Sequence, residues 1–189
     1  MLTLSRAIEL LQTTTTETHL ILHAKNVMIA MGGMAEYFDE NVEYWMAIGY
    51  LHDFDYQQYP DEHLRHTEEQ LKEAGLKEDD IRAILSHGYG IINNVKPITN
   101  LEKSLYTVDE LTGIIQAASK MRPNGIVDMD IRSFMKKFKD KSFAAKCNRE
   151  IIKNGCSMLN LDVNKVATIC IEAMKKHADE LHLIGVDAK

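Results

Sequence analysis

The chain has 189 residues, of which 45% are hydrophobic and 26% are charged. This length is sufficient for one well-buried core, and these fractions are ordinary for a globular protein. The formal net charge of −6 argues against a general electrostatic attraction to nucleic acid polymers or to an anionic membrane surface.

The cysteines and the N-terminal residues further limit the kinds of protein that this chain can be. Cys147, Cys156 and Cys170 are odd in number and lack Cys-x-x-Cys spacing, which argues against a disulfide framework and a thiolate zinc site. The first residues lack a signal pattern, and no apolar run approaches bilayer length. We therefore expect a cytoplasmic protein. Long helical periodicities with only three prolines predict an all-α fold.

The first two predicted helices lead to a candidate histidine. Residues 3–12 predict a short amphipathic helix, and the threonines at 13–16 favour a turn or cap. The next helix is expected from Glu17 to Met31, with its end at Gly32-Gly33. His23 lies at the edge of its apolar stripe, where a histidine either bonds a backbone carbonyl or binds a metal.

The third predicted helix, from about Glu40 to His52, is strongly apolar and ends in a histidine followed by Asp53. Burying two polar groups is costly unless each finds a partner. A divalent metal ion is such a partner, because imidazole nitrogen and carboxylate oxygen both bind it well. The pair therefore predicts a metal site, provided that further ligands lie elsewhere in the chain.

Later helices carry further histidines. After Pro60 the periodicity predicts a helix to about Ala74, with His63 and His66 on one face. A following helix begins near Glu78 and ends at His87, again after an apolar stripe.

A long helix is expected from Leu101 to about Ser119 and carries Asp109 beside its buried stripe. A carboxylate there needs a cation or several donors, so Asp109 is either a metal ligand or the partner of a basic side chain. Two more helices are expected near 143–159 and 162–182. The basic run from Lys136 to Lys141 is either a solvated helix face or a phosphate-binding edge.

In chain order, His23, His52-Asp53 and Asp109 resemble the pattern of the HD superfamily of metal-dependent phosphohydrolases. That pattern is an isolated histidine, a His-Asp dyad and a distant aspartate, each on a different helix. The resemblance covers about residues 20–116. It implies a compact multi-helix bundle, and we expect residues 1–189 to form a single HD-type domain with a C-terminal helical extension over 121–189.

The resemblance also implies a centre of one or two divalent transition metal ions, namely manganese, iron, cobalt, nickel or zinc. The expected ligands of the first ion are His23, His52, Asp53 and Asp109. By order and context, His66 and His87 match the ligands of a second ion, with Asp53 as the bridge.

The expected function is metal-dependent hydrolysis of a small phosphate ester, which is a phosphomonoester, a phosphodiester or a nucleotide. Besides Asp53, the nearby carboxylates of Asp55 and Asp61 are the candidates for general acid or base. Lys103, or the lysines at 136–141, would neutralise phosphate charge. The alternatives are a di-iron oxygenase of the HD type and a non-catalytic helical module that binds metal or nucleotide.

Two departures from the superfamily's motifs bear on the substrate. Some members carry glutamate or lysine three residues after the dyad, where this chain has Tyr56. The segment after His87 is Gly88-Tyr89-Gly90 in place of Gly-Tyr-Pro. Both argue against hydrolysis of alarmones or of cyclic di-GMP.

Overall fold

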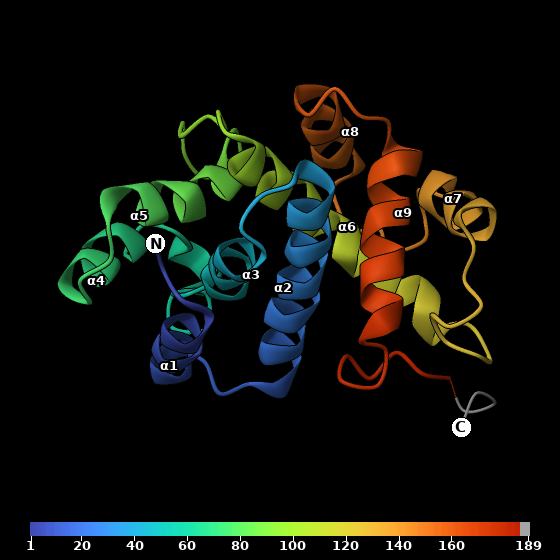
Figure 1. Cartoon of the computed structure of the whole chain (residues 1–189), viewed down its shortest axis with the longest axis horizontal. Helices are drawn as coiled ribbons and strands as arrows, with labels where there is room; N and C mark the ends of the chain where they lie inside the picture. The colour runs from blue at the N-terminus through green and yellow to red at the C-terminus, as the bar shows by residue number, and fades with distance from the viewer. Residues whose placement is uncertain (186–189) are drawn as a thin grey trace.

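The computed structural model describes residues 1–185, and within them the chain is all-α, as predicted, with no β-strand (Figure 1). The α-helices are α1 Leu4–Thr14, α2 Thr18–Phe38, α3 Val42–Leu51, α4 Thr67–Glu73, α5 Glu78–Leu85, α6 Asn100–Lys120, α7 Ile131–Lys139, α8 Arg149–Met158 and α9 Val163–Lys176. Two short 3-10 helices, η1 Pro60–Glu62 and η2 Ser86–Gly88, lie on either side of α4 and α5. Among the described residues, no helix has both the length and the apolar character needed to cross a bilayer.

Local capping signals determine where several helices begin. The side chains of Thr3, Asn41 and Asp162 each accept a hydrogen bond from a backbone N–H in the first turn of the helix that follows. Thr99 and Glu102 form a reciprocal capping box at the start of α6. This box begins the helix that carries Asp109.

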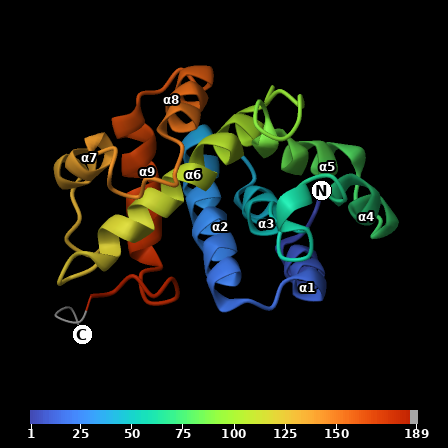
Figure 2. The ribbon, with the colours of Figure 1, turned by 180° about the vertical axis from the view of Figure 1, so that it is seen from behind.

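The core lies where α2 packs against α3, α6 and α9. Helix α6 runs obliquely across α2 and α9, as Figure 2 shows from behind. Met31, Ile48, Leu105 and Ile114 are fully buried at these contacts. Because α2, α3 and α6 share this core, residues far apart in the sequence are held at fixed positions on three helices.

Helix α2 continues through Gly32 and Gly33, so the predicted end at Met31 is wrong. A Cβ on Gly33 would lie 2.7 Å from the Cβ of Ala173 on α9, and one on Gly32 would lie 3.1 Å from Met46 on α3. These glycines therefore allow close packing on two sides of the helix. The helix ends instead at Asp39, which has a left-handed φ of 56°.

The contact between α2 and α3 is equally close at Gly49, one turn before the His-Asp pair. A Cβ on Gly49 would lie 2.8 Å from Cγ of Met31 and 3.2 Å from the carbonyl oxygen of Val27. Val27 is one turn after His23 on α2. Because Gly49 has no side chain, α3 can pack closely on α2, which brings the segments that carry His23 and His52 next to each other.

We expect Gly49→Ala to lower the free energy of unfolding by about 1–3 kcal/mol, because an added methyl group in a packed core forces the helices apart. Urea denaturation followed by circular dichroism measures this change. An unchanged unfolding midpoint would show that α3 can move away from α2 without cost.

Candidate metal centre

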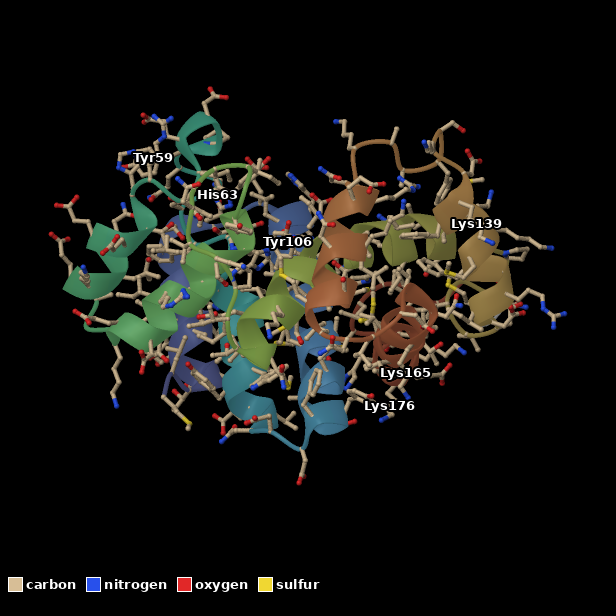
Figure 3. All side chains as sticks on the ribbon, turned by 90° about the horizontal axis from the view of Figure 1, so that it is seen from above. Tyr59, His63, Tyr106, Lys139, Lys165 and Lys176 are labelled. Atoms are coloured by element: carbon tan, nitrogen blue, oxygen red, sulfur yellow. The ribbon has the colours of Figure 1, made fainter. Side chains whose placement is uncertain are left out.

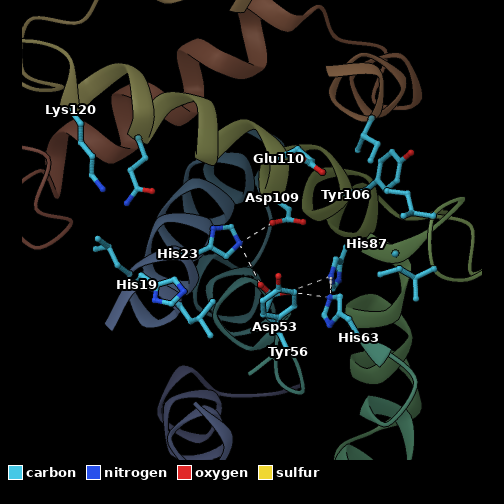
Figure 4. A pocket seen from close by; sticks show the side chains of 17 residues that line it. His19, His23, Asp53, Tyr56, His63, His87, Tyr106, Asp109, Glu110 and Lys120 are labelled. Carbon is cyan, nitrogen blue, oxygen red and sulfur yellow. Dashed lines mark hydrogen bonds and ion pairs between the residues drawn. The ribbon is translucent and has the colours of Figure 1, made fainter. Parts of the chain in front are cut away.

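Three helices bring four of the predicted residues together, and Figure 4 draws three of them, His23, Asp53 and Asp109. His23 comes from α2, His52 and Asp53 from the end of α3, and Asp109 from α6. Nε2 of His23 lies 3.0 Å from Oδ1 of Asp109 and 3.2 Å from Nε2 of His52. Nε2 of His52 lies 3.3 Å from Oδ2 of Asp53. These atoms form one compact group of nitrogen and oxygen donors.

A second group lies on the other side of Asp53. Nε2 of His63 is 3.3 Å from Oδ1 of Asp53, and Nε2 of His87 is 3.6 Å from the same oxygen. The two Nε2 atoms are 3.2 Å apart. The two carboxylate oxygens of Asp53 therefore face different sets of histidines.

The orientation of three of these histidines is set by acceptors behind them. Nδ1 of His52 donates to the carbonyl of Gly49 at 2.8 Å, and Nδ1 of His87 donates to the carbonyl of Ile84 at 2.6 Å. Nδ1 of His63 donates to a carboxylate at 2.8 Å. In the neutral ring the proton is then on Nδ1, so each Nε2 presents a lone pair to the centre.

The electrostatics of the first group favour positive charge at its centre. Burial alone would lower the pKa of His52, but the carboxylates of Asp53 and Asp109 outweigh it and raise that pKa well above its usual range. Burial would raise the pKa values of Asp53 and Asp109, but the neighbouring histidines hold both below the usual range. The ionised carboxylates of Asp53 and Asp109 are therefore stabilised by positive charge close to them.

Burial opposes protonation of His63 as well, yet Asp53 and Asp55 raise its pKa to about 9.

Nε2 atoms that face each other at 3.2 Å repel unless a proton or a metal ion lies between them. The donor set of imidazole nitrogens and carboxylate oxygens is the one that divalent transition metals bind. These residues therefore fit the expected metal.

His66, the predicted ligand of the second ion, is not in this group, and His63 lies there instead. Nε2 of His66 is 3.2 Å from a carboxylate oxygen of Glu62, and its ring lies against Tyr59 with centroids 4.1 Å apart. The predicted helix from 60 to 74 is interrupted, since Leu64 has a left-handed φ of 65°. His63 and His66 therefore do not share a helix face.

The start of α4 at Thr67 explains this difference. The pattern Thr67-Glu68-Glu69-Gln70 is typical of a helix start, with acidic residues in the first turn. It is the local signal that could have placed the helix boundary after His66. The inward direction of His63 depends on the buried Asp55, which no local pattern indicates.

Asp55 supports His63 and cannot reach a substrate, so its predicted role as acid or base is wrong. It is fully buried, and its Oδ1 accepts from Nδ1 of His63 at 2.8 Å and from the backbone N–H of Leu64 at 3.1 Å. These bonds hold the pKa of Asp55 below its usual range despite burial, which alone would raise it.

Two other predicted residues lie outside the centre. Asp61 is exposed on η1, and neither Asp61 nor Lys103 lines the cavity in the described part of the chain. Lys136, Lys137 and Lys139 of the basic run line other grooves, and Lys139 lies at the opposite end of the molecule from His63 (Figure 3). The structure therefore does not bring these three lysines to the centre.

The centre opens into a cavity of about 500 Å³. Its wall includes residues of α6 that the sequence interpretation missed, namely Tyr106, Glu110, Gln116 and Lys120. Tyr106, Gln116 and Lys120 follow the helical spacing of Asp109, which is the signal that could have found them. Glu110 is held by the backbone N–H of Asn148, which donates to its Oε2 at 2.8 Å.

Comparisons with known proteins agree with this geometry. A protein-family model described as HD domain matches residues 20–114, a span that contains all six clustered residues. Neither the curated proteins nor the solved structures give a significant match to the chain.

Proposed function

Because the chain belongs to the HD domain family, whose members are mostly metal-dependent hydrolases, we propose that it hydrolyses phosphate esters at a dinuclear metal centre. The observation that carries this proposal is the position of Asp53. Its Oδ2 lies 3.3 Å from Nε2 of His52, and its Oδ1 lies 3.3 Å from Nε2 of His63. A carboxylate that faces two sets of inward lone pairs is suited to bridge two cations.

Each half of the centre has its own ligands. The first set of ligands would be His23, His52 and Asp109, completed by Oδ2 of Asp53. The second set would be His63 and His87, completed by Oδ1 of Asp53. Divalent ions bound in this way lower the pKa of water and polarise a phosphoryl oxygen. The helices that carry the ligands share one core, so the ligands are positioned before a substrate binds.

Residues of the cavity wall would bind the substrate next to the metal centre. The cavity volume of about 500 Å³ is sufficient to admit a small organic phosphate to the centre. Hydrolysis then adds water across a phosphorus–oxygen ester bond and releases the alcohol, together with phosphate from a monoester or with a monoester from a diester. Lys120 is placed on the wall to attract an anionic substrate.

The support of His63 by Asp55 gives a specific test. We expect Asp55→Ala to weaken binding of one metal ion and to reduce kcat about 10- to 100-fold, because residues that orient metal ligands have effects of this size. Asp55→Asn is the matched control, since both hydrogen bonds use Oδ1 and an amide oxygen can accept them. Metal titration and phosphate release measure the two effects. Equal losses in both variants would contradict a positioning role.

The function itself is tested with the purified protein, reconstituted with manganese, iron, cobalt, nickel or zinc and supplied with a panel of phosphomonoesters, phosphodiesters and nucleotides. We expect hydrolysis that a chelator abolishes and that added metal restores, followed as phosphate released from monoesters and nucleotides and as monoester released from diesters. Metal binding without turnover across the panel would favour a binding module. Turnover that consumes oxygen would favour a di-iron oxygenase.

A further inference from the structure

Large apolar side chains that face solvent gather at the cavity of the metal centre. Tyr56, Ile91 and Ile92 are 39%, 61% and 42% exposed, and all three line this cavity. Tyr56 lies directly in front of the clustered ligands in Figure 4. Single exposed apolar residues are common, but an apolar group at the mouth of a cavity marks a binding surface.

The loop that carries the two isoleucines is firmly held. The carbonyl of Gly88 accepts from the N–H groups of Ile92 and Asn93 at 2.9 and 3.2 Å. The side chain of Asn93 donates to the carbonyl of Leu85 at 2.8 Å. The loop is thereby fixed to the segment that carries His87, so Ile91 and Ile92 keep a constant position relative to the centre.

The apolar surface continues from the mouth into the cavity. Leu20, Leu22 and Ile151 line it together with the ring of Tyr106. These side chains come from α2, α8 and α6, and α6 packs against both of the other helices. A substrate that reaches the metal centre therefore passes between hydrocarbon surfaces.

The charges on the wall limit the charge of the substrate. Of the described residues, Lys120 alone brings a lysine or arginine to this cavity, where Glu110 adds a carboxylate beyond those of the metal centre. Lys120 follows Asp109 by eleven residues on α6, which is about 16 Å along the helix axis. Recognition of a polyphosphate uses several basic side chains close to the metal ions. The cavity therefore suits one phosphoryl group.

We propose that the substrate is a phosphate monoester of an apolar alcohol, with an alkyl or aryl group that packs on Tyr56, Ile91 and Ile92. This inference rests on the proposed function, since it places the single phosphoryl group at the metal centre. The hydrocarbon group lies on the apolar wall, and the oxygen of water replaces the alkoxy or aryloxy oxygen on phosphorus when that ester bond breaks. The alcohol that leaves takes up a proton from the attacking water.

A homologous series of substrates tests this inference. With the metal-loaded protein, kcat/KM is measured for ethyl, butyl and hexyl phosphate, for 1-naphthyl phosphate, and for AMP and ATP. Each methylene group that leaves water contributes about 0.8 kcal/mol, or roughly fourfold in kcat/KM. We expect hexyl phosphate to exceed ethyl phosphate at least tenfold, and the aryl ester to exceed both nucleotides.

The possible failures are distinguishable. Equal rates along the alkyl series, or a preference for either nucleotide, would overturn this inference and leave the phosphohydrolase proposal standing. If none of these esters is hydrolysed with any metal, this inference is wrong, and the proposed function is wrong as well if the phosphodiesters of the wider panel also fail.

A pair of variants locates the apolar surface. The double variant Ile91→Asn/Ile92→Asn removes exposed side chains, and we expect it to flatten the dependence on chain length to within about twofold. Ile98→Asn is the matched control, because Ile98 is also 61% exposed in the segment before α6 but lines a different cavity. A double variant that keeps the full chain-length dependence would place the alkyl group elsewhere.

Discussion

Asp53→Ala is expected to lose both metal ions and to reduce kcat/KM by about 10³-fold or more. The two oxygens of this carboxylate face different sets of histidines, so its removal affects both halves of the centre. Bound metal ions contribute several kcal/mol to transition-state stabilisation, which corresponds to a loss of this size. Elemental analysis of the dialysed variant and phosphate release measure the two effects.

Asp61→Ala is the matched control for this variant. Asp61 is an exposed carboxylate close in sequence to the dyad and outside the cavity wall. We expect it to keep its metal ions and its activity within about twofold, as surface substitutions usually do. Full metal content in Asp53→Ala would exclude the bridging role.

His63→Ala and His66→Ala form the second test, because they separate the structure from the sequence pattern. We expect His63→Ala to lose one metal ion and to reduce kcat about 10²-fold or more, since it removes a ligand of the second group. His66 pairs with the exposed Glu62, so His66→Ala should keep both ions and activity within about twofold. The opposite result would restore the ligand set that the resemblance to the HD superfamily implies.

Sequence patterns are sufficient for the first group because each of its members lies in a regular helix or directly follows one. His23 and Asp109 lie beside apolar stripes, and His52-Asp53 follows one. Helical spacing therefore indicates that each points to the core side of its helix. The order of these residues along the chain then supplied the resemblance to the HD superfamily, and the matched family model agrees with it.

The second group depends on contacts that no local pattern contains. His63 points inward because Leu64 takes a left-handed conformation and because the buried Asp55 accepts from both residues. Likewise, α2 continues through Gly33 because α9 brings Ala173 to that point. In both places a partner outside the local segment determines the backbone, so propensity alone predicts the wrong boundary.

The number of metal ions per chain tests the central claim most directly. The protein is purified without chelator or affinity-metal carryover, reconstituted in turn with manganese, iron, cobalt, nickel and zinc, and analysed by elemental mass spectrometry. The position of Asp53 between two sets of histidines leads us to expect two ions per chain with at least one of these metals. One ion or none with every metal would contradict a dinuclear centre.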